Sequence, residues 1–175
     1  MKKERSNIDY EFVRKNIGVF VGKCVEFMAA ESAPKDILEI GANIPSPLAK
    51  LFRKKFDGCN YLETNLDAKP PIDVCAIDFE DAKFDCVVCA EVLEHVKYPW
   101  IAMQEMARIL RPKGWLIVTV PFFIEYHWGP EDHWRFSPTG LRILFDLAKV
   151  TPVLVETKEK EKNRFQNVMG LARNG

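Results

Sequence analysis

The sequence has no excess of either charge and no long uninterrupted apolar run. Its 25 Lys and Arg residues balance its 25 Asp and Glu residues, and the pI is about 6.8. Without a net positive field the chain does not attract polyanions, so we expect no nucleic-acid partner. The longest apolar stretches, Trp115 to Phe123 and Ile17 to Ala30, are too short or too interrupted by charge to span a bilayer.

The first residues, MKKERSNIDY, lack the pattern of a secretory signal peptide, and the five cysteines are an odd number at scattered positions. We therefore expect a reduced, cytoplasmic protein. Cys86 and Cys89 form a C-x-x-C pair, which in other settings binds zinc or does redox chemistry. Inside a strand, however, residues three apart point to opposite faces, which favours two buried small side chains.

The most informative stretch is FDCVVCAEVLEHV, which begins at Phe84. Its first seven residues are too uniformly apolar for a strand with one wet face, so they predict a parallel strand covered by helices on both sides. Glu91, Glu94 and His95 follow at the carboxyl end of this strand. Ligands of open α/β sheets bind at that end, so the stretch predicts a pocket there.

The remaining pattern predicts an α/β protein of alternating elements. With 175 residues and 47% hydrophobic content, we expect a single domain, with a helical segment at 1–33 and the α/β core at 34–175. The first helix is expected to pack on the sheet edge or to cover the site. Residues 64–71 carry two prolines and predict a loop in place of a crossover helix. The predicted helices are 9–30, 47–56, 100–110 and 138–148, and the seven predicted strands are 36–41, 60–63, 72–77, 84–90, 115–120, 150–156 and 165–172.

The order of these elements resembles the class I S-adenosylmethionine-dependent methyltransferase fold. That fold is a doubly wound, Rossmann-like sheet of seven mostly parallel strands with a C-terminal antiparallel hairpin. The phrases FDCVVCAEVLEHV and ILRPKGWLIVTVPF are similar to the methyltransferase type 11 family, best known from small-molecule, lipid and quinone methylation. The resemblance runs from about Asp36 to Phe145, and it implies an enzyme that transfers a methyl group from S-adenosylmethionine.

The acids at the strand ends agree with the charge of this cofactor, which carries a sulfonium and an ammonium group but no phosphate. The resemblance places Glu39 and the Gly41-Ala42 backbone beside the methionine portion, and Ala90 and Glu91 over its ammonium group. It also gives Glu63 the ribose hydroxyls, and Asp78 the adenine amine with Phe79 beside the ring. The full set implied for the cofactor is Glu39, Gly41, Ala42, Asn43, Glu63, Thr64, Asp78, Phe79, Ala90 and Glu91.

The first motif departs from the family pattern, because Glu39-Ile40-Gly41-Ala42-Asn43-Ile44-Pro45 keeps only the first of the usual glycines. Asn43 tolerates a left-handed backbone, whereas Pro45 is stiff and has no amide hydrogen. An alternative is therefore a methyltransferase-like binding or scaffold subunit that has lost catalysis. A single acid at a strand end is also often only a helix cap or a solvated group.

Glu91, Glu94 and His95 form an E-x-x-E-H pattern, which in some RNA and quinone methyltransferases resembles a divalent-metal site completed by another histidine. The same letters occur in relatives without a metal, where the histidine only lines the pocket. We take that second interpretation and expect no metal.

The long stretch 121–136 contains His127 and His133 among aromatic residues, and loops of this length are usually functional. Its sequence resembles a segment that borders the acceptor pocket of methyltransferases associated with polysaccharide or lipid-sugar genes. We predict His127 or His133 as the base that removes a proton from the acceptor, with His95 behind them. The acceptor is expected to be a small molecule, such as a sugar or a lipid-linked intermediate. Packing within the loop is the alternative for Trp128, Trp134 and Phe136. A nicotinamide oxidoreductase is a weaker option, because no G-x-G-x-x-G follows the first strand.

Overall fold

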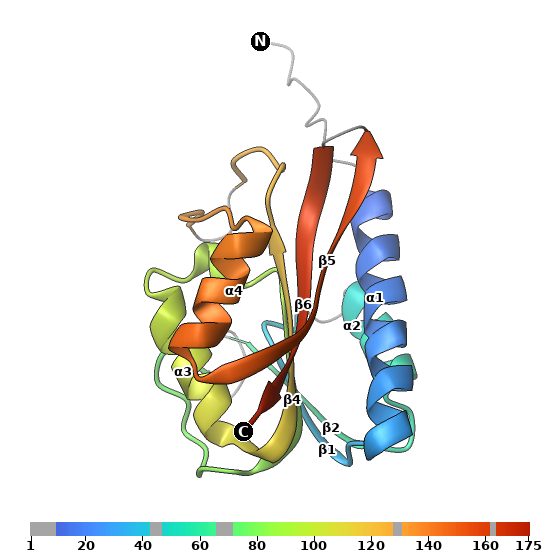
Figure 1. Cartoon of the computed structure of the whole chain (residues 1–175), viewed down its shortest axis with the longest axis vertical. Helices are drawn as coiled ribbons and strands as arrows, with labels where there is room; N and C mark the ends of the chain where they lie inside the picture. Colours follow the sequence, from blue (N-terminus) through green and yellow to red (C-terminus); the bar gives the residue numbers. More distant parts are fainter. Residues whose placement is uncertain (1–9, 43–46, 66–71, 128–130, 162–163) are drawn as a thin grey trace.

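A six-stranded mixed sheet lies between two helical layers in the computed structural model, which describes residues 10–42, 47–65, 72–127, 131–161 and 164–175 (Figure 1). The strand order is β2-β1-β3-β4-β6-β5. Strands β2, β1, β3 and β4 are parallel, and β6 and β5 are antiparallel to their neighbours. The strands are β1 (Asp36–Ile40), β2 (Asn60–Thr64), β3 (Phe84–Ala90), β4 (Leu110–Pro121), β5 (Val150–Glu161) and β6 (Arg164–Asn174).

The predicted class I methyltransferase architecture is confirmed, including the C-terminal antiparallel hairpin. The predicted strands at 36–41, 60–63 and 84–90 agree with the structure to within a residue at each end. The last three strands are longer than predicted. β4, for example, begins at Leu110 because the expected turn at 111–114 continues its pairing with β3 through an irregularity in register.

Two helices cover each face of the sheet (Figure 1). α1 (Tyr10–Glu31) and α2 (Pro47–Lys55) lie on one face, and α3 (Pro99–Ile109) and α4 (Pro138–Leu147) lie on the other. α1 buries Ile17 and Phe20 in one cluster with Trp115 of β4, so it covers a face of the sheet. The expectation that this helix packs on the sheet edge was therefore wrong, and the alternative that it covers the site stays a prediction.

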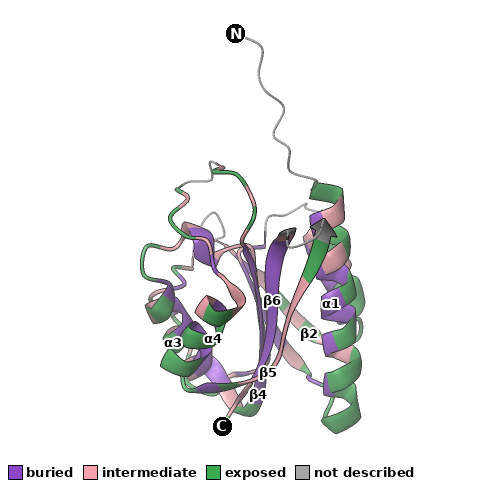
Figure 2. Ribbon diagram, turned by 45° about the horizontal axis from the view of Figure 1, so that its top comes forward, coloured by how far each residue is buried: buried purple, intermediate pink, exposed green. Residues whose placement is uncertain are grey.

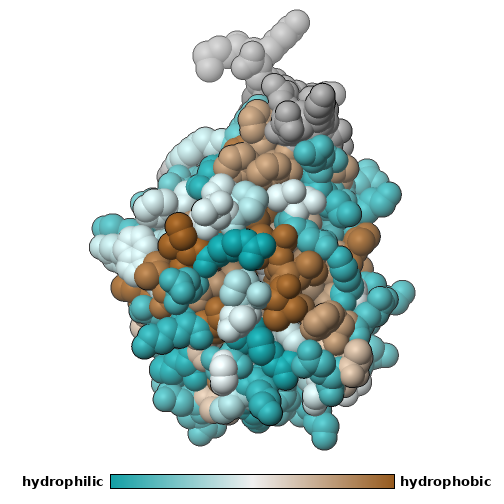
Figure 3. Space-filling model, viewed as in Figure 1, coloured by the Kyte–Doolittle hydropathy of each residue, from teal (hydrophilic) through white to brown (hydrophobic). Residues whose placement is uncertain are grey.

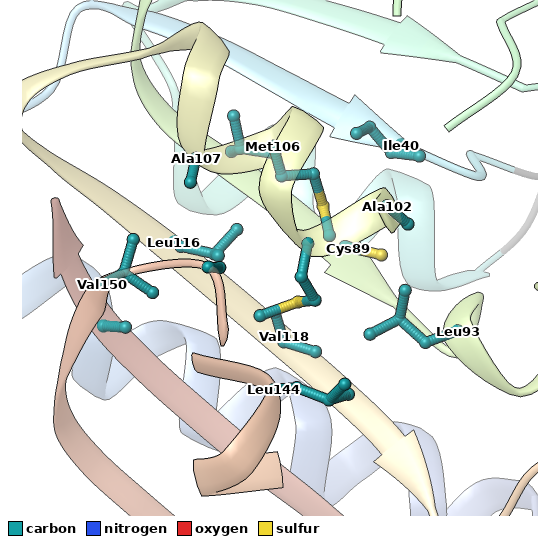
Figure 4. Close-up of a cluster of buried hydrophobic side chains, with 14 of the residues drawn as sticks. Ile40, Cys89, Leu93, Ala102, Met106, Ala107, Leu116, Val118, Leu144 and Val150 are labelled. Carbon is teal, nitrogen blue, oxygen red and sulfur yellow. The ribbon is translucent and has the colours of Figure 1, made fainter. Parts of the chain in front are cut away.

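The second core cluster lies between the sheet and the α3–α4 layer. Figure 4 shows Met106 of α3 and Leu144 of α4 turned towards Cys89 and Val118 of the sheet. Cys86 belongs to the opposite cluster, beneath α1. Both thiols are free and fully buried on opposite faces, which confirms their interpretation as small core side chains.

The predicted third strand, 72–77, does not form, and the sheet therefore has six strands instead of seven among the described residues. Asp73 accepts a hydrogen bond from the amide of Cys75 at 2.8 Å, and its carbonyl accepts one from Ala76 at 3.0 Å, so the segment turns. The amide of Ile77 donates to Glu105 of α3 at 3.0 Å instead of to a strand. Most of the predicted loop at 64–71 lies outside the described residues.

Burial follows the layered arrangement: the central strands are buried, and the outer faces of the helices are exposed (Figure 2). Figure 3 shows hydrophobic side chains in patches among hydrophilic ones on the face seen in Figure 1. Ile143 and Leu147 of α4 and Val153 of β5 are among the exposed hydrophobic residues. Among the described helices, none combines the length and the apolar character needed to cross a membrane.

Candidate active site

The carboxyl ends of four neighbouring parallel strands meet at one edge of the sheet. Ile40 at the end of β1 is in register with Thr64 of β2 and with Cys89 of β3, and Ala90 is in register with Thr119 of β4. Residues that follow these positions are therefore brought together although they are far apart in sequence. This edge is where ligands bind in open α/β sheets.

Glu39 is a buried carboxylate on β1, and only 4% of its surface is exposed. The hydroxyl of Tyr61 donates a hydrogen bond to its Oε2 atom at 2.7 Å. Burial, supported by the charge of Glu63 and opposed by the Tyr61 hydrogen bond, raises the pKa of Glu39 to about 7. The site therefore holds an acid that a cationic ligand would stabilise in its charged form.

Gly41 begins the turn after β1 with a left-handed backbone, at a φ of 78°. The amides of Gly41 and Ala42 both donate to the carbonyl of Thr64, at 2.7 and 3.0 Å. A Cβ atom on Gly41 would lie 2.2 Å from Cγ2 of Val92, so this position needs glycine for space as well as for conformation. Asn43, the next residue predicted to bind the cofactor, lies outside the described residues.

Glu63, predicted to bind the ribose hydroxyls, lies on β2 with an ion-pair partner. Arg53 of α2 donates to its two carboxylate oxygens at 3.2 and 2.5 Å. The Glu63 side chain is only 11% exposed, whereas that of Arg53 is 59% exposed. The arginine is thus the partner with more freedom to move if a ligand approaches Glu63.

Asp78 and Phe79 lie in the turn segment that replaces the predicted third strand. Asp78 is exposed, and Phe79 is partly buried with its ring edge-to-face against Phe84 at 5.2 Å. Arg108 of α3 anchors this segment, donating to the carbonyls of Ile77 and Phe79 at 2.8 Å each. No local pattern in the sequence indicated this anchor.

Glu91 directly follows β3 and has a left-handed backbone, at a φ of 54°. Its carboxylate lies between two polar side chains. Thr119 donates to one of its oxygens at 2.9 Å and Asn167 donates to the other at 2.7 Å. Burial raises the pKa of Glu91 above the usual range of a glutamic acid, despite these two hydrogen bonds. Sequence reasoning missed both partners. One feature of the sequence could have indicated Thr119, because it is the single polar residue in the apolar run LIVTVPF. No such feature marks Asn167.

Glu94, His95 and His127 form a second cluster at the same edge. Nε2 of His95 lies 3.7 Å from Oε1 of Glu94, and the two imidazole rings are 5.1 Å apart and almost perpendicular. The Glu94 side chain is only 1% exposed, and its Oε2 has no hydrogen-bond partner among the described residues. Burial, with the charge of Glu91 next, raises the pKa of Glu94, and burial lowers the pKa of His95.

His133, the other histidine predicted as a base, makes different contacts from those of His95 and His127. Its Nε2 atom pairs with the exposed Glu131 at 3.0 Å, and its backbone amide donates to the carbonyl of Glu94 at 2.7 Å. The structure therefore brings two of the three predicted histidines into ring contact and turns the third towards a surface acid.

The loop after β4 is tied down by Arg135. Its guanidinium donates to the carbonyls of Ile124 and Glu125 at 2.9 Å each and forms an ion pair with Asp132. The pairing with Arg135 is the main reason that the pKa of Asp132 falls to about 2. Asp132 also lies 3.5 Å from Nδ1 of His127, so this pair fixes the position of the histidine.

Three aromatic side chains contact one another next to the histidine cluster. Trp134 donates from Nε1 to the carbonyl of Val96 at 3.0 Å and meets the ring of Trp100 at 6.2 Å, and Trp100 in turn meets Tyr98 at 5.9 Å. These three rings are 38 to 43% exposed, which is unusual for side chains of this size. Phe136 is instead buried in the core, so loop packing was the correct alternative for it.

Together the fold and the carboxylates at the strand ends define a class I methyltransferase-like protein. Residues 21–118 match the family model described as Methyltransferase domain, which covers more than half of the chain, and the chain belongs to this family. Its cofactor is S-adenosylmethionine.

Comparison with known proteins agrees with this assignment. A 94-residue stretch is 36% identical to an uncharacterised protein of Methanocaldococcus jannaschii and covers 54% of this chain, but only 36% of that relative's length. The structure resembles the 1,6-didemethyltoxoflavin-N1-methyltransferase of Burkholderia thailandensis, crystallised with S-adenosylhomocysteine, with a TM-score of 0.69, 14% identity, and 90% and 78% of the two chains covered. It also resembles the N-methyltransferase NodS of Bradyrhizobium japonicum WM9, in complex with S-adenosylhomocysteine, with a TM-score of 0.61, 14% identity, and 90% and 87% covered.

Proposed function

We propose that this protein transfers a methyl group from S-adenosylmethionine to a small-molecule acceptor, most favourably a sugar or a lipid-linked sugar intermediate. The observation that carries the proposal is a pair of acids, the buried Glu39 and the partly buried Glu91, at the carboxyl ends of adjacent parallel strands. The described contacts of both carboxylates are mainly with neutral groups: Tyr61, Thr119 and Asn167. Such acids are costly to ionise alone and favour a cationic ligand.

The cofactor's two positive groups match this arrangement. In our proposal Glu39 and the Gly41-Ala42 backbone hold the methionine portion, and Ala90 and Glu91 lie over its ammonium group. Glu63 and Thr64 face the ribose, and Asp78 and Phe79 face the adenine. The segment that carries Asp78 is fixed by Arg108, so its position does not depend on a third strand.

The reaction needs alignment more than activation, because the sulfonium is already a good leaving group. A lone pair of the acceptor attacks the methyl carbon while the carbon–sulfur bond breaks, and its electron pair remains on sulfur as neutral S-adenosylhomocysteine. The acceptor's proton leaves to the histidine cluster. The charge of Glu91 raises the pKa of Glu94, so the cofactor acid and this cluster lie near each other. We assign His127 or His95 to this step in preference to His133, which pairs with Glu131.

The exposed rings support the choice of acceptor. Tyr98, Trp100 and Trp134 form a continuous aromatic surface that is joined to the histidine cluster through Val96. Aromatic surfaces of this kind bind the apolar faces of ring-shaped ligands, while nearby polar groups fix their orientation. A sugar ring has such faces and carries hydroxyl groups that can accept a methyl group.

Calorimetry with S-adenosylhomocysteine tests the cofactor site. We expect one binding site per chain and at least about tenfold weaker binding in Glu39→Gln and Glu91→Gln, because each loses a charge-assisted contact worth about 1.5–3 kcal/mol. Glu26→Gln is the matched control, since Glu26 is exposed on α1. A folded wild-type sample that binds neither S-adenosylmethionine nor S-adenosylhomocysteine would instead support the scaffold alternative.

A further inference from the structure

We propose that Glu94, His95 and His127 form a binding site for one divalent transition-metal ion, with Zn²⁺ as the best-matched candidate. The proposal goes beyond methyl transfer, because it concerns a ligand other than the cofactor and the acceptor. It also differs from the E-x-x-E-H pattern in the sequence, because it leaves out the first acid of that pattern.

The geometry of the cluster is close to that of a bound ion. One potential ligand atom from each of the three residues lies within 4.8 Å of the other two. Ligands about 2.1 Å from a tetrahedral ion are roughly 3.4 Å apart, so small side-chain rotations would close the site. The contact between Nε2 of His95 and Oε1 of Glu94, at 3.7 Å, already approaches this spacing.

An independent observation is the unpartnered oxygen of Glu94. Its side chain is 1% exposed, and Oε2 has no hydrogen-bond partner among the residues that the structure describes. A buried carboxylate oxygen without a partner is costly, and a directly bound cation removes that cost. The competing explanation is a proton on Glu94, which the experiment below distinguishes.

The outer contacts orient the imidazole of His95 as a metal ligand. Its Nδ1 contacts the carbonyl of Glu131, which can only accept, so this Nδ1 carries the hydrogen and Nε2 keeps its lone pair. Nδ1 of His127 lies 3.2 Å from the carbonyl of Glu125 and 3.4 Å from the guanidinium of Arg135, and these contacts hold the ring in place beside His95. Histidines that bind metals usually donate their other ring hydrogen in this way.

The charges around the cluster favour a cation. Arg135 is the nearest positive side chain, at 3.4 Å from Nδ1 of His127, but it forms an ion pair with Asp132 and so brings little net charge. Glu91 lies close enough to act on the charge of Glu94. The site therefore combines two acids with a neutralised arginine–aspartate pair.

Glu91 is not a ligand in this arrangement, because Thr119 and Asn167 each occupy one of its oxygens. The remaining donor set is one carboxylate and two imidazoles. That set suits Zn²⁺ and other transition metals, whereas Mg²⁺ and Ca²⁺ require mostly oxygen ligands. An ion with three protein ligands keeps an open position, at which it would bind an acceptor hydroxyl and lower its pKa so that the proton passes to water. With the ion bound, this effect would replace the proton-accepting role proposed above for a free His127 or His95.

The test measures metal content and metal affinity in the full chain. After treatment with a chelator, the wild type is equilibrated with Zn²⁺ or Mg²⁺, dialysed, and analysed by elemental mass spectrometry and calorimetry. We expect one Zn²⁺ per chain and at least about 100-fold weaker binding of Mg²⁺. Glu94→Gln, His95→Asn and His127→Asn should each weaken Zn²⁺ binding at least tenfold. Co²⁺ should give visible absorption bands in the wild type that these variants lose.

His133→Asn is the matched control, since it removes the same side chain from the same loop but outside the cluster. It should bind Zn²⁺ as the wild type does, whereas Glu91→Gln, which removes a neighbouring charge but no ligand, should weaken binding less than the three ligand variants. The proposal is overturned if the wild type binds no stoichiometric Zn²⁺, if Mg²⁺ is preferred, or if His133→Asn loses as much affinity as His127→Asn. If Glu94→Gln does not fold, the Zn²⁺ affinity of His127→Asn decides the result, because the His127 side chain is 26% exposed and its replacement disturbs the core less. Binding of S-adenosylhomocysteine, measured on the same samples, tests the methyltransferase proposal separately.

Discussion

At the scale of single residues, Glu39 is an acid whose environment clearly departs from that of a solvated carboxylate. It lies almost out of water, with the Tyr61 hydroxyl as its hydrogen-bond donor, and its pKa rises to about 7. An acid with a raised pKa binds a proton more tightly in the folded chain than in the unfolded chain. Its contribution to stability is therefore present at low pH and is lost as the pH rises.

The first prediction concerns this pH dependence. Between pH about 4.3, where an unfolded glutamic acid titrates, and pH about 7, the stability of the wild type should fall by roughly 3 kcal/mol relative to Glu39→Gln. Denaturant unfolding of both proteins at pH 5, 6, 7 and 8 measures this difference. A constant difference across the range would show that Glu39 is an ordinary surface-like acid.

Cofactor affinity should have the opposite pH dependence. Binding of the cationic S-adenosylmethionine favours ionised Glu39, so affinity should increase from pH 6 to pH 8 and should level off above the pKa of about 7. Calorimetry in two buffers with different ionisation enthalpies should also detect proton release at pH 6. Glu39→Gln should show a flatter profile, and an unchanged profile would remove Glu39 from the site.

Gly41 permits a second residue-scale prediction, because the chain offers a matched control. Gly41 and Gly58 both have positive φ values, 78° and 80°, but only Gly41 is crowded, by Val92. Gly58→Ala should cost about 1 kcal/mol of unfolding free energy, from backbone strain alone. Gly41→Ala should cost roughly 2–4 kcal/mol, because the clash adds to the strain, and Gly41→Ala/Val92→Ala should recover part of that loss. Equal costs at the two glycines, measured by urea unfolding, would contradict this account.

The sequence could indicate the acids of the site but not their partners. Glu39 and Glu91 were recognisable because Glu39 lies near the end of a short apolar strand and Glu91 directly follows another. Tyr61 reaches Glu39 from the neighbouring strand β2, and Asn167 reaches Glu91 from β6, beyond β4. Such contacts depend on strand order and register, which local patterns do not contain. The pairing of Glu63 with Arg53 was missed for the same reason.

At the scale of elements, the segment at 72–79 shows how a strand prediction fails. Its apolar residues are spaced like those of a short strand, but Asp73 captures a nearby amide and so favours a turn. Arg108 and Glu105 of α3 then satisfy backbone groups that a neighbouring strand would otherwise bond. Helices, by contrast, were predicted to within about a residue or two at each end, because their apolar spacing and their prolines are local signals.

The element-scale prediction tests this anchor. Arg108→Met removes the hydrogen bonds to Ile77 and Phe79, and its side chain is 31% exposed, so we expect a loss of about 1–3 kcal/mol. Hydrogen exchange should increase in residues 72–82 more than elsewhere, and cofactor affinity should fall. Arg142→Met, an exposed change on α4, is the control and should alter neither. Uniform exchange across the chain would contradict a local anchoring role.

At the scale of the whole molecule, the layered sheet was predictable from the alternation of helical and strand patterns. What remained hidden was the loss of the predicted third strand, because its apolar spacing resembles that of a strand, whereas Asp73 and the side chains of α3 satisfy its backbone groups. The Glu94 cluster was hidden for a related reason: His127 lies 32 positions after His95, and only the fold brings their rings within 5.1 Å.

The order of the strands has a consequence for how this protein is made. β6 lies between β4 and β5, so the sheet cannot close until residue 174 has left the ribosome. Asn167, one of the two donors that hold Glu91, arrives in that same stretch. A nascent chain that already contains every acid of the site would therefore still lack Asn167, which orients Glu91. The cofactor site would be complete only after β6 has been made.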